Sequence, residues 1–237
     1  TASNNTAVGF QTLNANTTGA TNTAVGTNSL LANTTGGANV AIGYQALDAN
    51  TTGGTNTAVG KAAMTTNTTG SQNTAVGLSA LQNNTTASEN TAVGYTSLLS
   101  NTTGTQNSAV GYNSLYSNTT GSYNTALGRA SLLANTTGTH NSAIGRSALQ
   151  NNTTGSYNTG LGMDAASSTT TGNYNVSIGF NAQATSATAS EQFTLGDSNI
   201  SNLRCNDTSI SSLSDSRDKT DVIDSPYGLD FINTVRP

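Results

Sequence analysis

The segment Asn124-Thr-Ala-Leu-Gly-Arg-Ala-Ser-Leu-Leu-Ala-Asn-Thr-Thr-Gly-Thr-His140 is one copy of a 17-residue unit that fills most of the chain. An asparagine opens each copy, the interval between copies is 17 residues without an insertion, and a glycine follows four residues after each asparagine. A strict period of this length is typical of a solenoid, in which each repeat forms one turn and packs only against its neighbours. The opening asparagines are Asn5, Asn22, Asn39, Asn56, Asn73, Asn90, Asn107, Asn124, Asn141, Asn158 and Asn175.

Numbered from this asparagine as position 1, positions 2–5 read Thr-Ala-Val-Gly with small variations, which is typical of a short β-strand. Because strand side chains alternate between faces, the aliphatic position 4 and the Ala and Gly positions lie on opposite sides. We expect position 4 to fill the interior of the turn together with position 9, which is leucine in most copies. The small residues at position 8 predict a close approach of backbones there. The sequence thus predicts an all-β fold, a parallel β-solenoid or β-roll, over residues 4–196.

Positions 12–15 read Asn-Thr-Thr-Gly and are predicted to form the corner that closes each turn, since asparagine and glycine tolerate a positive φ. Identical asparagines in successive turns can also form a hydrogen-bonded ladder. Two other interpretations remain open at this point. Asn-Thr-Thr is an N-glycosylation sequon, and the ranked threonines are similar to the threonine arrays of ice-binding solenoids.

The composition excludes several classes of function. Only 8% of the 237 residues are charged, and the repeat array of residues 1–190 sums to zero charge, so the net −4 comes from the remainder. A neutral rod offers no stripe of cations for phosphate groups, which argues against a nucleic-acid partner. The lone Cys205 permits no disulfide within the chain, and His140 has no ligand partner nearby in sequence, so we expect no metal and no cofactor. No apolar run is long enough for insertion into a membrane.

The expected core is thin, and this predicts self-association. Two large aliphatic side chains per turn contribute roughly 3–6 kcal/mol, whereas ordering 17 residues costs ~1–2 kcal/mol for each. We therefore expect a homo-oligomer, with identical chains packed through the bare Ala and Gly face. The chain begins at Thr1 and stops at Pro237 in what reads as the middle of a domain, so we interpret it as a fragment.

Two positions vary freely from copy to copy and are the places where recognition is expected. Position 6 carries Tyr44, Tyr95 and Tyr112 among charged and aliphatic residues, and position 17 ends in the run Tyr123, His140, Tyr157 and Tyr174. An aromatic ring on a rigid scaffold could stack on a sugar or another ligand. The alternative is plain packing between neighbouring turns, in which case His140 is an ordinary member of its column. The ligand-binding candidates are Tyr44, Tyr95, Tyr112, Tyr123, Tyr157 and Tyr174.

The repeat decays toward the C-terminus. In the tenth copy the leucine becomes Ala166 and the corner reads Thr169-Thr-Thr-Gly172, while a degenerate twelfth copy, Gln192-Phe-Thr-Leu-Gly196, keeps its phase. Terminal repeats of such stacks are commonly atypical. We predict a neck of short strands and turns over residues 197–213, after eleven full repeats and the degenerate one.

Two resemblances bear on function. The motifs Asn-Thr-Ala-Val-Gly and Asn-Ser-Ala-Ile-Gly resemble the head repeats of trimeric autotransporter adhesins, which implies a parallel β-roll in a homotrimer. The segment Leu213-Ser-Asp-Ser-Arg-Asp-Lys-Thr220, followed by Tyr227-Gly-Leu-Asp-Phe-Ile-Asn-Thr-Val-Arg-Pro237, resembles the start of the self-cleaving intramolecular chaperone domain of phage tail fibres, tailspikes and endosialidases. This second resemblance implies that residues 214–237 begin such a domain.

The chaperone resemblance also implies a catalytic pair. Ser214 would be the nucleophile, Lys219 its base, and the bond between Ser214 and Asp215 the one that is cut; a serine and a lysine form a known variant of the serine triad. The competing interpretation of these residues is a polar turn before a helix. Because only the start of the domain is present, we expect this chain not to act as an enzyme.

Taken together, the residues and the resemblances lead us to expect a trimeric shaft of a phage tail fibre on the virion, extracellular, which adheres to a glycan or protein receptor on the host cell. The alternative is a bacterial surface adhesin or extracellular filament. A glycan-cutting tailspike is disfavoured because Asp48, Glu89 and Asp164 are scattered singly through the array, whereas such enzymes need two carboxyls ~5–9.5 Å apart.

Overall fold

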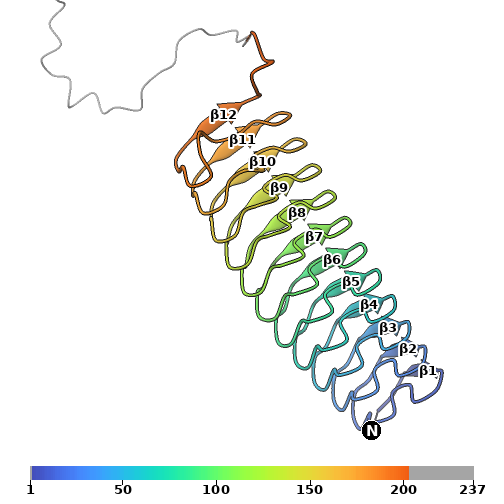
Figure 1. The fold of residues 1–237 in the computed structure, drawn as a ribbon. Helices are drawn as coiled ribbons and strands as arrows, with labels where there is room; N and C mark the ends of the chain where they lie inside the picture. Colours follow the sequence, from blue (N-terminus) through green and yellow to red (C-terminus); the bar gives the residue numbers. More distant parts are fainter. Residues whose placement is uncertain (1, 203–237) are drawn as a thin grey trace, which may run out of the picture. The chain divides into compact units, whose positions relative to one another are not determined.

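The computed structural model describes residues 2–202, and these contain the whole repeat array. The array is built of twelve three-residue strands joined by turns (Figure 1). The array lies within the unit Thr1–Ile200. The strands are β1 Thr6–Val8, β2 Thr23–Val25, β3 Val40–Ile42, β4 Thr57–Val59, β5 Thr74–Val76, β6 Thr91–Val93, β7 Ser108–Val110, β8 Thr125–Leu127, β9 Ser142–Ile144, β10 Thr159–Leu161, β11 Val176–Ile178 and β12 Phe193–Leu195.

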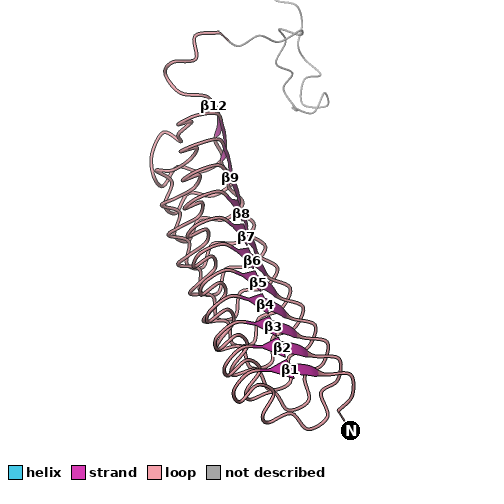
Figure 2. Ribbon diagram, turned by 90° about the vertical axis from the view of Figure 1, so that its right-hand side faces the viewer, coloured by secondary structure: helices cyan, strands magenta, loops and turns pink. Residues whose placement is uncertain are grey.

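The strands form one parallel sheet in sequence order, β1 to β12, so each repeat is one turn of a solenoid. Thr6 pairs with Thr23 and Val8 with Val25, and the same offset of 17 residues joins every neighbouring pair of strands. Figure 2 shows the strands in a single row along one side of the array. The predicted all-β parallel solenoid is confirmed, and its last strand, β12, pairs with β11. Below, the turns are numbered 1–12 by the strand that each contains.

The interior of each turn is filled by the alanine of position 3 and the leucine of position 9. Ala41 and Leu47 of turn 3, for example, are both fully buried. The aliphatic position 4 faces outward instead: Ile42 is 40% exposed and Leu127 is 47% exposed. The prediction that position 4 fills the interior is therefore wrong. A turn of 17 residues is too narrow to hold two large side chains at one level, so the strand presents its alanine to the leucine and turns its aliphatic residue away.

The Ala and Gly face was expected to pack against identical chains, but the same geometry places it inside the array. Alanine is enclosed inside the turn, and the glycine of position 5 lies against the glycine of the next turn. Gly94 has a φ of +135°, and a Cβ placed on it would lie 2.4 Å from the carbonyl oxygen of Gly111. These residues are therefore not available for packing between chains; they serve the close stacking of turns within one chain.

Small residues at position 8 allow the close approach that was predicted for them. Ser29 is fully buried, and its hydroxyl donates a hydrogen bond to the carbonyl oxygen of Ala41 at 2.8 Å. Leu30 and Ala32, which follow it, donate backbone hydrogen bonds to Ala46 and Asp48 of the next turn at 3.0 Å. The side of the turn opposite the strand is thus also hydrogen-bonded along the stack.

Two asparagine ladders run through the array. At position 12, the amide of Asn50 donates to Asn33 Oδ1 and to the carbonyl oxygen of Gly53, both at 2.9 Å. At position 1, the backbone nitrogen of Asn39 donates to Asn22 Oδ1 at 2.9 Å, and its side chain donates to the same Gly53 oxygen. The predicted ladder is confirmed, and because the Asn and Gly of one turn also bind each other, it closes the turn as well as joining it to the next.

The corner uses its glycine for a different reason from the one expected. The non-glycine residues with a positive φ lie at positions 7, 9 and 17, as in Ala62 (58°), Met64 (52°) and Gln72 (60°). The corner residue Gly53 has no such φ, but a Cβ on it would lie 2.4 Å from the carbonyl oxygen of Gly70. The prediction of a positive φ at the corner is therefore wrong, and close approach is what requires glycine there.

The corner asparagines of the Asn-Thr-Thr sequons are buried in the folded chain, which leaves their side chains inaccessible to glycosylation. Asn33, Asn50 and Asn118 are fully buried, and the amide nitrogen of each donates to two acceptors. The folded array has no room for a glycan at these atoms. The threonine that follows binds along the stack, as when Thr51 Oγ1 donates to the carbonyl oxygen of Thr68 at 3.0 Å, and the next threonine is exposed.

After β12 the described chain continues as far as residue 202. Asp197 to Ile200 form a turn closed by a backbone hydrogen bond of 3.1 Å. Residues 197–202 therefore contain a turn and no strand, and the rest of the predicted neck lies outside the described residues. Among residues 2–202, no helix is long and apolar enough to cross a membrane.

Candidate recognition surfaces

The side chains that point outward around the strands form one continuous surface, which we call the strand face. It consists of positions 17, 2, 4 and 6 of every turn; position 2 is mostly threonine or serine, and position 4 is valine, isoleucine or leucine. Positions 1 and 3, between them, point inward and are buried in turns 2–11. The strand face thus carries an aliphatic stripe along all twelve turns, bordered by the two variable positions. The stripe is Val8, Val25, Ile42, Val59, Val76, Val93, Val110, Leu127, Ile144, Leu161, Ile178 and Leu195.

Position 6 holds three of the predicted ligand-binding tyrosines, and all three are exposed. Tyr95 and Tyr112 stack on each other, with ring centroids 5.2 Å apart and ring planes 7° from parallel. The Arg129 guanidinium carbon lies 5.9 Å from the centroid of the Tyr112 ring, at the limit of a cation–π contact. Tyr44 is apart from them, between the turns that carry Thr27 and Lys61, and it stacks on no ring within residues 2–202.

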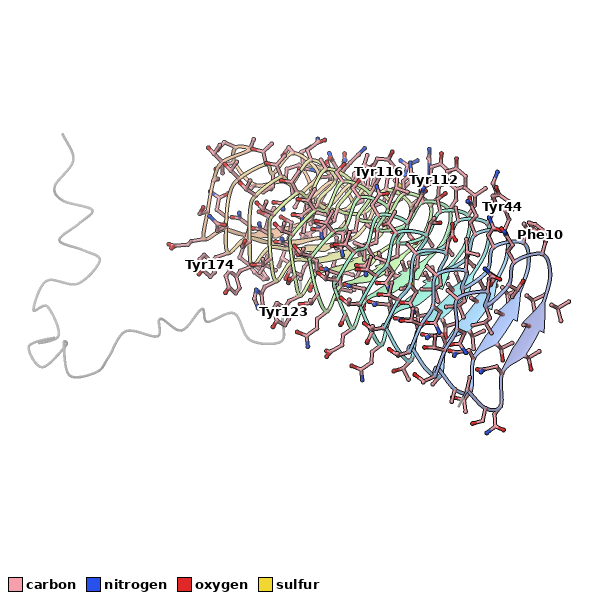
Figure 3. The ribbon with its side chains drawn as sticks, turned by 90° about the horizontal axis from the view of Figure 1, so that it is seen from below. Phe10, Tyr44, Tyr112, Tyr116, Tyr123 and Tyr174 are labelled. Carbon is pink, nitrogen blue, oxygen red and sulfur yellow. The ribbon has the colours of Figure 1, made fainter. Side chains whose placement is uncertain are left out.

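Position 17 gathers the other three predicted tyrosines into a single aromatic column. Tyr123, His140, Tyr157 and Tyr174 stack in that order, with centroids 4.7, 4.8 and 4.9 Å apart and planes within 17° of parallel. His140 is an ordinary member of this column, as predicted. Figure 3 shows that Phe10, Tyr44 and Tyr112 lie along one edge of the array, whereas Tyr123 and Tyr174 lie along another.

Stacking limits what these rings can bind. A sugar that packs on an aromatic ring needs a free ring face, but His140 and Tyr157 have both faces covered by their neighbours, and Tyr95 and Tyr112 each have one covered. The aromatic column offers to solvent its ring edges, a row of tyrosine hydroxyls, and one ring face each of Tyr123 and Tyr174 at its two ends. Tyr44 is the candidate whose two faces are clear of other rings among the described residues.

Charge on the array is sparse. Arg146 and Asp164 form an exposed ion pair at 3.5 Å, a kind of contact that contributes little to stability. Burial raises the pKa of Asp48 above the usual aspartate value, and the hydrogen bond that Gln45 Nε2 donates to Asp48 Oδ2 at 3.4 Å acts in the opposite direction. Over residues 2–202 no group of three or more His, Cys, Asp or Glu side chains is arranged to hold a metal ion.

The predicted catalytic pair, Ser214 and Lys219, lies outside the described residues, as does Cys205. Comparison with known proteins gives no family for the chain: no model of a known protein family matches it, and no curated protein and no solved structure does so either.

The aliphatic stripe is the surface that the sequence analysis missed. Its signal was present, because position 3 is alanine in nine successive copies and changes only to glycine, serine and threonine at the C-terminal end. A position that stays this small in every turn is constrained by a narrow space, whereas position 4 varies between valine, isoleucine and leucine without constraint. That contrast assigns position 3 to the interior.

Proposed function

We propose that this chain is a shaft segment of a phage tail fibre, in which three copies pack side by side as a homotrimer outside the cell. The observation that supports it is the aliphatic stripe, which runs without a break along a rod of stacked turns. Such a fold suits a fibrous structural protein, whose task is to hold its ends apart. The resemblance of Leu213–Thr220 to the chaperone domain of tail fibres supports the phage assignment.

The size of the strand face favours association between chains. Twelve strands ~4.8 Å apart give a length of roughly 50 Å, and the six residue steps from position 17 to position 6 give a width of about 20 Å. The area is thus about 1,000 Å² in all, of the order of the roughly 800 Å² that each partner commonly buries in a stable protein interface. In a trimer this area is divided between two neighbouring copies. Within this face the aliphatic stripe is one side chain wide in each turn, and an exposed apolar row that continues over twelve turns is typical of an interaction surface.

The host-facing role in this proposal belongs to the exposed tyrosines. These tyrosines lie at the two margins of the strand face, where the rim of a contact between copies stays accessible to solvent. The receptor-contact candidates at these margins are Tyr44, Tyr95, Tyr112, Tyr123, Tyr157 and Tyr174. Tyr95 and Tyr112 stack on each other, and the three tyrosines of position 17 stack in one column with His140. Their hydroxyls are therefore the groups that would form hydrogen bonds with a receptor.

The mass of the chain in solution tests the proposal. Sedimentation equilibrium of the intact protein should give three times the chain mass of 23.8 kDa. Val76→Asp places a charge on the stripe and should dissociate the trimer, because a buried unpaired charge is strongly unfavourable. Thr69→Asp, on the exposed corner of the same array, is the matched control and should leave the trimer intact. A stable monomer of the unaltered chain would refute the homotrimer.

A bacterial surface adhesin or extracellular filament is the second candidate, favoured by the Asn-Thr-Ala-Val-Gly motif that recurs through the array. Both candidates predict a rod, so the location of the native molecule separates them. Antibodies raised against residues 1–200 should label the tails of virions in electron micrographs if the tail-fibre proposal is right. Labelling of a bacterial envelope, with none on virions, would favour the adhesin.

A further inference from the structure

The last three turns differ from the others in their interior. We call turns 10–12, residues 158–196, the C-terminal turns. Leucine, or methionine in one turn, occupies position 9 through Leu149 of turn 9, but turn 10 has Ala166 and turn 11 has Gln183 there. At position 3, Gly160 replaces the alanine of the earlier turns. The C-terminal turns therefore bury much less apolar side chain inside than turns 2–9 do.

Polar contacts inside the C-terminal turns are also weaker. The position-12 asparagine ladder ends at Asn152 of turn 9, because Thr169 stands at that position in turn 10. The hydroxyls of Thr169 and Ser177 are buried and have no hydrogen-bond partner within residues 2–202. A buried polar group without a partner destabilises the folded state. In a single chain, the interior of turns 10–12 is therefore less well stabilised than the interior of turns 2–9.

The outer surface shows the opposite trend. On the strand face, the C-terminal turns carry larger apolar side chains at positions 4 and 6 than most earlier turns do. Position 17 is Thr, Ala, Gln or Glu in turns 1–6 and tyrosine or histidine in turns 7–10. The exposed apolar residues of the C-terminal turns are Leu161, Met163, Phe180, Phe193 and Leu195. Compared with the earlier turns, the C-terminal turns therefore have smaller apolar side chains inside and larger ones outside.

We infer that the C-terminal turns are where copies of this chain meet most tightly, turns 10–12 of one copy against turns 10–12 of the next, and that these turns depend on that contact for their stability. The inference rests on the proposed association of copies and says where the binding energy is concentrated. In protein interfaces a few large, central side chains commonly carry most of the affinity, and the C-terminal turns supply such side chains.

The geometry of the strand face favours a copy of the chain over another partner. The face repeats at the spacing of the turns along its whole length, so a second rod with the same spacing can match it side chain for side chain. The face is also nearly neutral: its charged residues are Lys61, Glu89, Arg129, Arg146 and Glu191, and Arg146 is already paired with Asp164. Identical faces therefore do not repel each other.

The first experiment compares the same substitution at the two ends of the stripe in the full chain. Ile178→Ser lies at position 4 in turn 11, and Ile42→Ser lies at the same position in turn 3. Sedimentation of both variants over a concentration series gives the dissociation constant. We expect Ile178→Ser to weaken association at least about tenfold more than Ile42→Ser does, because it removes a side chain from the tightest part of the contact.

The second experiment follows hydrogen exchange of the backbone amides in the unaltered chain, above and below the concentration at which it dissociates. On dilution, the strands β10–β12 should lose protection, while β2–β9 should keep it in the separated chain. Exchange measures local stability directly, so this result does not depend on how a variant folds.

The outcomes distinguish this inference from the proposed function. If the unaltered chain associates but the two serine variants weaken it equally, or if β10–β12 stay as protected as β2–β9 after dilution, the inference is overturned and the oligomeric shaft stands. A chain that is monomeric at every concentration overturns both. If the chain is a monomer and the backbone amides of all strands, β10–β12 included, are protected from exchange, another segment of the same chain covers the strand face. This result also overturns the inference.

Discussion

Asn101 illustrates how one residue type can both close a turn and join it to its neighbours. Its amide donates to Asn84 Oδ1 at 3.1 Å and to the carbonyl oxygen of Gly104 at 2.9 Å, and its own oxygen accepts from Asn118 at 2.9 Å. All of these atoms lie in a fully buried column. An asparagine in the interior of a fold is stable only when its hydrogen bonds are complete, and stacking of identical turns completes them.

Replacing this asparagine should therefore destabilise the array. We expect Asn101→Ala to lower the stability by about 2–4 kcal/mol, since it leaves buried partners in two neighbouring turns unsatisfied. Thr103→Ala, at the exposed corner position of the same turn, is the control and should change stability by less than about 0.5 kcal/mol. Thermal unfolding followed by circular dichroism measures both; equal midpoints for the two variants would contradict the role given to the ladder.

Asp48 gives a prediction about pH. Its raised pKa means that the folded chain holds the proton more tightly than the unfolded chain, so this residue's contribution to stability falls as pH rises from about the unfolded value of 3.8. Asp48→Asn should raise the melting temperature at neutral pH. The gain should shrink as pH falls through the raised pKa of folded Asp48 and be lost once pH is below the unfolded value of 3.8. Glu89→Gln removes an exposed charge of the same sign; a gain as large in that variant would show that net charge, and not burial, is the cause.

At the scale of the turn, the register of the strand is what keeps the array intact. Each strand is only three residues long, so a shift by one residue exchanges its inward and outward side chains. Nothing within one strand prevents this shift. The constraint comes from the alanines above and below it, as Ala92 pairs with Ala75 and Ala109 in one enclosed column.

A pair of deletions tests this constraint. Removal of Asn90–Gln106 takes out one complete turn and should give a folded array that is one turn shorter, because Glu89 then joins Asn107 in the original phase. Removal of Ala92 alone should disrupt the stack, because it brings Val93 to the inward position, where a larger side chain does not fit. Proteolysis of both variants gives the comparison, and a single-residue deletion that resists protease as well as the unaltered chain would be evidence against the narrow interior.

At the scale of the whole molecule, the chain combines a neutral array with an acidic remainder that bears the resemblance to a self-cleaving domain. The chaperone resemblance implies that such a domain assists assembly of the shaft and is then removed. Without the domain, a shaft that has unfolded would refold only slowly. The C-terminal turns, with their large outward side chains, are the part of the array nearest to it in sequence.

The cleavage itself can be predicted. In a longer expression product that carries the rest of the domain, we expect a cut between Ser214 and Asp215, with Ser214 as nucleophile and Lys219 as base. Ser214→Ala and Lys219→Ala should each give an uncut product that still forms trimers, as seen by gel electrophoresis and intact mass. A cut at the same bond in the Ser214→Ala chain would disprove the assigned pair, and Thr208→Ala serves as a control for general effects of substitution.

The sequence by itself determined the period, the parallel stack, the asparagine ladder and the exposure of positions 6 and 17. A repeat of constant length allows one solution in which every turn meets its neighbour in the same register, so these features follow from spacing alone. The leucine of position 9 was placed inside for the same reason. The positions of Tyr123, His140, Tyr157 and Tyr174 in one column also follow from the period.

Which face of the strand points inward was decided only by the tertiary structure. Alternation defines two faces but does not say which is inside, and hydrophobicity favoured the valine of position 4 over the alanine of position 3. The narrow turn reversed that choice, because its interior has room for one leucine and an alanine at each level. The left-handed backbone at Leu47 and the ring stacking that covers Tyr157 have the same origin: closing the turn and stacking the copies impose both, and neither leaves a local signal in the sequence.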